Sequence, residues 1–122
     1  MLDLDICIVS GTLKDHPEIR MSDNGHEYSI FTIAMHKKFK STRTGEYIES
    51  VQWVRCVVFL KHIVEQSKLL RRGNKVQVHG CLSIVTKIDK NMVQHHQTSI
   101  VVDKLIYHQK AIYEKPEDLT NK

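Results

Sequence analysis

The stretch Trp53-Val54-Arg55-Cys56-Val57-Val58-Phe59-Leu60-Lys61 alternates between two kinds of side chain. In an extended strand, successive side chains point to opposite faces of a sheet. One face of this stretch is uniformly apolar and suits a protein core, with Val54, Cys56, Val58 and Leu60. The other face combines two aromatic rings with cations, with Trp53, Arg55, Val57, Phe59 and Lys61. The stretch therefore predicts a strand with a core face and an aromatic, basic second face.

The second face has two interpretations. Bases stack on flat rings and cations hold phosphates, so rings among cations are typical of surfaces that bind single-stranded nucleic acid. Alternatively, the strand is buried on both faces, and the long side chains of Arg55 and Lys61 carry their charges out to solvent. The run alone leaves both interpretations open.

Four further segments have strand character, so that the expected strands are 6–13, 28–36, 49–60, 75–85 and 97–106. Between the third and fourth, residues 61–72 place apolar side chains at roughly helical spacing, and Gly73 follows where a helix C-cap belongs. Gly11 and Gly80 are expected to bend their strands. This order predicts an all-β fold, the five-stranded OB-fold, which is a Greek-key β-barrel with one helix between strands 3 and 4.

The connections also suit this fold. The Asp23-Asn24-Gly25 turn joins the first two expected strands, and longer connections span about 39–48 and 87–96. In OB-folds, connections 1–2 and 4–5 and the face of strands 2 and 3 line the oligonucleotide groove. Residues 1–108 are expected to form this one domain, and the polar residues 109–122 a loose tail.

Composition narrows the class of protein. With 41% hydrophobic and 26% charged residues the chain suits a folded domain, and its net charge of +4 favours a polyanionic partner. Residues 36–43 contain four cations and no acid. The three cysteines are widely spaced in apolar runs, which predicts free thiols in a reducing compartment and a cytoplasmic location. No apolar run is long enough to span a membrane.

Several short motifs occur in a characteristic order: Gly11-x-Leu13-x-x-x-Pro17-Glu18-x-Arg20, Asn24-Gly25, Phe31-Thr32-Ile33-Ala34, Thr44-Gly45-Glu46, Trp53-x-Arg55-x-Val57-x-Phe59-x-Lys61, and Leu70-Arg71-Arg72-Gly73-x-x-Val76-x-Val78-x-Gly80-x-Leu82. In this order and spacing the chain resembles the bacterial single-stranded DNA-binding protein family over roughly residues 6–106. The resemblance implies an OB-fold, ssDNA binding without catalysis, and a homotetramer.

The resemblance also implies roles for individual residues. Trp53 and Phe59 match stacking aromatics of the family, and Phe39 falls where a stacking tryptophan is common. Arg55, Lys61, Arg71 and Arg72 fall on or beside basic positions of its groove. With the basic run and the end of strand four added, the candidate ssDNA-binding residues are Phe39, Trp53, Phe59, Arg55, Lys61, Lys37, Lys38, Lys40, Arg43, Arg71, Arg72 and Lys87.

Two features depart from the family pattern. The run Ser83-Ile84-Val85-Thr86-Lys87 stands where the family usually has a basic run followed by an aromatic residue. The chain ends Glu117-Asp118-Leu119-Thr120-Asn121-Lys122, whereas family members typically end in an acidic segment with a terminal Pro-Phe that recruits replication and repair enzymes. Binding of such partners therefore stays open.

The function expected from these observations is sequence-independent binding of ssDNA, which protects it in replication, repair and recombination. Two alternatives remain: a primosome-type accessory protein of the same fold, and an OB-fold protein-interaction module that has lost DNA binding. No catalytic motif is present, and no enzyme activity, cofactor or metal is expected. His95 and His96 are adjacent, so their side chains should point apart rather than share a metal. Surplus apolar residues at Ile6, Ile8, Tyr28, Ile30 and Ala34 suit a homotetramer, with a dimer as the fallback.

Overall fold

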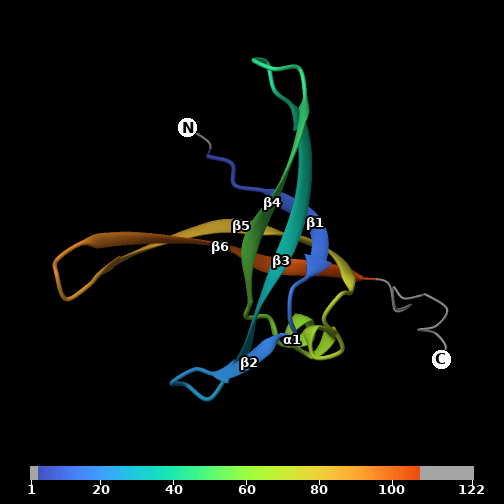
Figure 1. Ribbon diagram of the computed structural model, residues 1–122. Helices are drawn as coiled ribbons and strands as arrows, with labels where there is room; N and C mark the ends of the chain where they lie inside the picture. The colour runs from blue at the N-terminus through green and yellow to red at the C-terminus, as the bar shows by residue number, and fades with distance from the viewer. Residues whose placement is uncertain (1–2, 108–122) are drawn as a thin grey trace.

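The computed structural model describes residues 3–107, and the expected tail at 109–122 lies outside them (Figure 1). It contains six strands and one helix: β1 (Cys7–Leu13), β2 (Glu18–Met21), β3 (Glu27–Lys40), β4 (Tyr47–Val58), α1 (Lys61–Ser67), β5 (Lys75–Ile88) and β6 (Gln94–Tyr107). The sheet order is β1-β5-β6-β4-β3-β2, and an additional β1–β3 pairing closes a five-stranded barrel. The pairs are antiparallel except for β4 with β6. The predicted OB-fold is confirmed.

The core lies inside the barrel and comes from the apolar faces of the strands. Cys56 and Val58 of β4 are fully buried, as the alternation at residues 53–61 predicts. Ile63 and Val64 of α1 close one end of the barrel. Each large apolar side chain contributes about 1.5–3 kcal/mol when fully buried. Since α1 has seven residues and no side-chain N-cap, packing against the barrel rather than helix propensity stabilises it.

The expected helix is too long at its C-terminal end. Helix α1 ends at Ser67, whose buried hydroxyl donates to the Val64 carbonyl (2.7 Å) and lies 2.9 Å from the Ser29 hydroxyl. The chain then turns so that Leu70 enters the core. Gly73 is therefore not the helix cap. It has φ 91° and donates its N–H to the Leu13 carbonyl in the turn before β5.

Leu60 is the one residue of the predicted apolar face that does not join the core. Strand β4 ends at Val58, and Leu60 forms the N-cap of α1, where it is exposed. Its carbonyl accepts hydrogen bonds from the N–H groups of Ile63 and Val64. The prediction of a core position was wrong because the strand period does not continue into the helix.

Two hairpins are longer than expected and project from the barrel as two-stranded ribbons (Figure 1). The β3–β4 ribbon continues to the pair Lys40–Tyr47, and the β5–β6 ribbon to Ile88–Gln94. Strand pairing thus extends into both ends of the expected connections 39–48 and 87–96, which leaves shorter turns at 41–46 and 89–93. Strand β2 was not expected either, because all four of its side chains are exposed. The turn with Gly25 at φ 85° joins it to β3.

Burial of Cys56 raises the pKa of its thiol to about 12. At pH 8 its thiolate fraction is then roughly a thousandfold below that of an ordinary cysteine. We expect iodoacetamide to leave Cys56 unmodified in the native protein and to label it in urea, which peptide mass spectrometry can follow. Equal rates of Cys56 labelling in both conditions would contradict this burial. All three cysteines are free.

Candidate nucleic-acid interface

The aromatic and basic face predicted for residues 53–61 lies on the outside of the barrel. Trp53 is 58% exposed and Phe59 is 57% exposed, so the alternative of a strand buried on both faces is wrong at both rings. Directly opposed residues of an antiparallel pair lie on the same face of the sheet. Trp53 pairs with Ala34, Arg55 with Thr32, and Val57 with Ile30. This outer face of β3 and β4 is called the aromatic face below.

Trp53 carries a cation from another part of the chain. The Lys14 Nζ, in the segment between β1 and β2, lies 5.1 Å from the centroid of the Trp53 ring. This is within cation–π range, so a positive charge lies over the ring. Sequence reasoning missed Lys14 because only the closed barrel brings residues 14 and 53 together.

Arg55 is held in place by β6. It is half-buried, and its Nη1 donates a 2.7 Å hydrogen bond to the Oγ of the buried Ser99. Arg55 and Ser99 both line a pocket of about 260 Å³. Other residues of this pocket include Arg20, Tyr28, Phe59, Ser83 and Val85. A fixed guanidinium loses little freedom when it binds a phosphate, so the arrangement suits anion binding.

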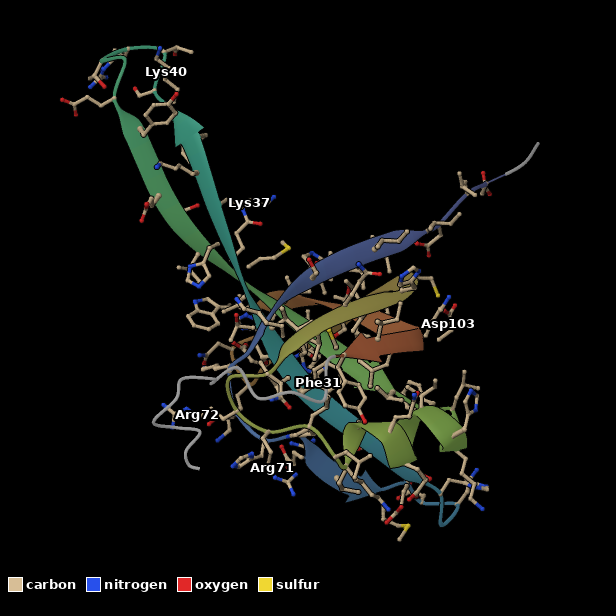
Figure 2. All side chains as sticks on the ribbon, turned by 90° about the vertical axis from the view of Figure 1, so that its right-hand side faces the viewer. Phe31, Lys37, Lys40, Arg71, Arg72 and Asp103 are labelled. Carbon is tan, nitrogen blue, oxygen red and sulfur yellow. The ribbon has the colours of Figure 1, made fainter. Side chains whose placement is uncertain are left out.

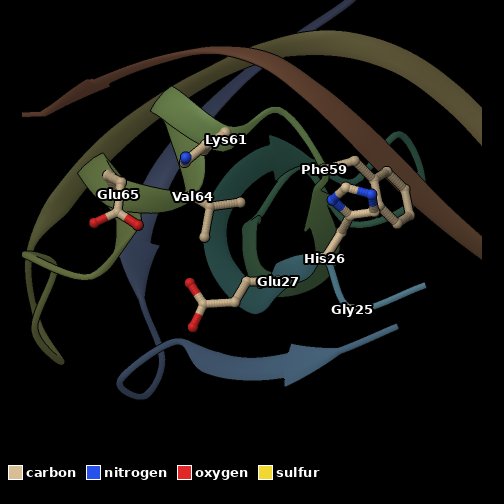
Figure 3. A pocket seen from close by; sticks show the side chains of 7 residues that line it. All are labelled: Gly25, His26, Glu27, Phe59, Lys61, Val64 and Glu65. Atoms are coloured by element: carbon tan, nitrogen blue, oxygen red, sulfur yellow. The ribbon is translucent and has the colours of Figure 1, made fainter. Parts of the chain in front are cut away.

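Phe59 lies between this pocket and a second one. Its ring centroid is 5.7 Å from that of Tyr28, with the planes tilted by 34°. The second pocket, of about 270 Å³, is shown in Figure 3 and is lined by Gly25, His26, Glu27, Phe59, Lys61, Val64 and Glu65. Both acids of this pocket form ion pairs with Lys68, whose Nζ lies 2.8 Å from Glu27 and 3.0 Å from Glu65. Their negative charges are therefore partly compensated. Lys61 and Phe59 line the same pocket, but Lys61 is the first residue of α1, so the strand alternation that predicted a shared face does not extend to it.

Arg20 extends the basic character of this end of the aromatic face. Hydrogen bonds to Glu18 and then to Tyr28 raise the pKa of Arg20, and the bond from Arg20 lowers the pKa of Glu18. Arg20 pairs directly with Tyr28 across β2 and β3. Sequence reasoning missed Arg20 because β2 carries no apolar alternation, and it assigned Tyr28 to an assembly surface instead.

The basic run of β3 is divided between two faces. Lys38 pairs with Glu49 and Lys40 with Tyr47. Both pairs lie an even number of residues from the Ala34–Trp53 pair and therefore on the same face as Trp53. Lys37 and Phe39 pair with Ser50 and Ile48, and therefore lie on the opposite face of the ribbon. Figure 2 shows Lys37 and Lys40 along this ribbon. Arg43 is exposed in its turn. The run predicted as one basic connection is thus split by the strand period.

The remaining candidates lie elsewhere. The Arg71 Nη1 donates to the carbonyls of Lys68 (3.1 Å) and Leu70 (2.9 Å), so it stabilises the turn after α1. Arg72 is exposed beside it, and Figure 2 shows both far from Lys40. Lys87 is exposed on β5, with the parity of the pocket residues Ser83 and Val85. It continues the line of Ser83 and Val85 out along the β5–β6 ribbon, where it pairs with His95.

The adjacent histidines point to different partners, as expected. His95 Nε2 lies 2.9 Å from Asp89 Oδ2, while His96 Nδ1 lies 3.1 Å from the Thr86 hydroxyl. Among residues 3–107, no group of three or more His, Cys, Asp or Glu side chains could hold a metal ion. Within the same range, no helix has the length and apolar character needed to cross a membrane.

Comparison with known proteins agrees with this geometry. Residues 5–107 match the single-strand binding protein family. Among solved structures, the chain is similar to a Plasmodium falciparum SSB in complex with ssDNA, with a TM-score of 0.81 and 24% sequence identity. That match covers 88% of this chain and 97% of the other, and it shows a shared fold. The chain belongs to the single-strand binding protein family, whose members bind single-stranded DNA and are not enzymes.

Proposed function

We propose that this protein binds ssDNA without regard to sequence and covers it during replication, repair and recombination. The observation that carries the proposal is Trp53, an exposed ring on the outer face of the barrel with Lys14 Nζ over it and the anchored Arg55 two residues along the same face of β4. Stacking is tolerant of sequence because every base has a flat face, and phosphates are the same at every nucleotide. Both kinds of contact thus favour coverage over base recognition.

The proposed division of labour follows the aromatic face. Bases stack on Trp53 and Phe59, while Arg55 and Lys61 hold phosphates beside them. Further phosphate contacts are proposed for Lys38, Lys40, Arg43, Arg72 and Lys87, which are exposed. Phe39 and Lys37 would act where the strand passes the other face of the ribbon. Arg71 would contribute charge only, since carbonyls occupy its Nη1.

Titration of the protein with oligo-dT tests the proposal. Trp53 is the single tryptophan, so intrinsic emission reports on this site alone. We expect quenching at low salt, similar quenching by mixed-sequence oligonucleotides, and an affinity that falls steeply with salt through counterion release. The absence of both quenching and a mobility shift at low salt would reject DNA binding and favour the protein-interaction module.

A homotetramer is proposed as the assembly, with a dimer as the fallback. Ile8 in β1 is exposed, and so are Leu4 and Ile6 in the segment just before it, Ile6 by 67%. Residues 7–11 of β1 pair with β5 on one edge, and no strand within residues 3–107 pairs with their other edge. An open edge with apolar side chains favours association with another chain. Several grooves in one particle would also bind a strand more tightly than one groove, because later contacts become intramolecular.

Light scattering at micromolar concentration is expected to give a mass near four times the 14.2 kDa of one chain. Replacing Ile6 and Ile8 by lysine should lower the mass, whereas the same change at the exposed Ile88 of the far ribbon serves as the control. A wild-type mass near one chain would reject the assembly.

We further propose a cytoplasmic location, in keeping with three free cysteines.

A further inference from the structure

Tyr47 lies at the far end of the aromatic face, on the projecting β3–β4 ribbon. Tyr47, Trp53 and Phe59 follow one another at intervals of six residues, so Tyr47 and Trp53 point to the same face of β4. Six residues of extended strand span about 20 Å. Tyr47 is 65% exposed, slightly more than Trp53. The ribbon thus carries, six residues from Trp53 along β4, a second exposed aromatic ring on the same face.

The surroundings of Tyr47 are also similar to those of Trp53. The Lys38 Nζ lies 5.3 Å from the centroid of the Tyr47 ring, and Lys14 Nζ lies 5.1 Å from that of Trp53. Lys40 pairs directly with Tyr47. Glu49, opposite Lys38, is the acid of this face between the two rings. Each ring therefore has a cation placed to meet a phosphate.

A purely structural role explains Tyr47 less well. A tyrosine that stabilised the hairpin would bury its ring against cross-strand neighbours, and such a pair contributes only about 0.2–1 kcal/mol. Tyr47 instead leaves most of its surface in solvent. Its hydroxyl makes no hydrogen bond within the described part of the chain. Exposed aromatic surface beside cations is the arrangement that single-stranded nucleic acid uses.

We propose that Tyr47 is a further base-stacking residue, so that the bound strand continues along β4 from Phe59 past Trp53 to Tyr47 on the ribbon. This inference rests on the proposed function. Lys38 and Lys40 then hold the phosphates of this outer segment. A strand too short to reach the ribbon contacts only the barrel, whereas a longer one also contacts Tyr47.

The test compares Tyr47→Leu, which removes the π face but keeps an apolar side chain, with Tyr47→Phe, which keeps the ring. Ile48→Ala is the matched control, because Ile48 is the neighbouring exposed apolar residue on the opposite face of the ribbon. Affinity is measured by Trp53 quenching with oligo-dT of about 4 to about 16 nucleotides, the range covered by single OB-folds. Circular dichroism checks that each variant keeps its fold.

Tyr47→Leu is expected to lower the affinity for the longest oligonucleotide by about tenfold and to leave the affinity for the shortest unchanged. Tyr47→Phe and Ile48→Ala should bind like the wild type. Equal affinities of Tyr47→Leu and wild type for the longest oligonucleotide would overturn the inference, as would equal losses in Tyr47→Leu and Ile48→Ala. Failure of the proposed function is distinct, because the wild type itself would then show no quenching.

Discussion

Trp53→Ala is expected to weaken binding of oligo-dT by about 1–3 kcal/mol, which is roughly five- to 150-fold. The change removes the ring that Lys14 Nζ lies over, while Lys14 and the neighbouring cation Arg55 remain. Because stacking releases few counterions, the slope of log K against log salt should stay the same. The variant lacks the single tryptophan, so fluorescence anisotropy of a labelled oligonucleotide replaces intrinsic emission as the measurement.

The contrasting variant is Lys38→Ala with Lys40→Ala, which removes two cations from the same face and no barrel ring. Its salt slope should fall by up to about two units, since each lost phosphate contact removes about one. Trp53→Phe keeps a stacking ring and should recover part of the affinity. A Trp53→Ala variant whose main change is in the salt slope would contradict the assigned roles.

The fold followed from the sequence because one face of each barrel strand is buried. Where one face of a strand is buried, its register is well determined, because a shift by one residue would move the apolar side chains from the core to the solvent face. The run 53–61 shows this well, since Cys56 and Val58 are buried while Trp53 and Phe59 are exposed. The helix was also predicted at the right place in the strand order. It ends at Ser67, earlier than the spacing of its apolar residues predicted, because the chain turns there and buries Leu70 in the core.

The ribbons could not be predicted in the same way. Residues 37–40 and 47–50, which pair along the β3–β4 ribbon, are buried on neither face, so no core position sets the period there. Once β3 continues to Lys40, the strand period places Phe39 opposite to Trp53 and brings Tyr47 onto the aromatic face. A residue assigned to a loop has no face. Sequence reasoning therefore grouped Phe39 with Trp53 and Phe59 as stacking residues and assigned no role to Tyr47. The stacking role of Phe39 stays a prediction.

Gly80 marks an irregularity in the β5–β6 pairing, as its expected role at a bend suggests. His79 pairs with Lys104, but the next residue, Gly80, pairs with Val102, so Asp103 is the extra residue of β6. Asp103 is exposed and is labelled in Figure 2. A bulge adds one residue to one strand, so side chains before and after it that are an odd number of residues apart can lie on the same face. Because of this extra residue, Leu105 on one side and Val102 and Ile100 on the other all point into the core.

The bulge also explains why this position is glycine. A Cβ atom built on Gly80 would clash with the carbonyl oxygen of Val101, and it would lie 2.8 Å from the Val101 carbonyl carbon and 3.0 Å from the Val102 Cα. All three atoms belong to backbone that the sheet holds in place. No rotation of a side chain can relieve these contacts, so the strands must move apart at the bulge.

Gly80→Ala is therefore expected to lower the free energy of unfolding by about 3 kcal/mol, toward the upper end of the cost of overpacking. Gly45→Ala is the matched control: it is the same substitution at φ 78° with no atom within 4 Å of the new Cβ, and only the left-handed backbone should cost about 1 kcal/mol. Urea unfolding at one protein concentration measures both, since assembly makes stability concentration-dependent. A loss at Gly80 no larger than that at Gly45 would show that β6 can yield at Val101. The bulge that buries Leu105 together with Val102 would then not depend on a glycine at this position.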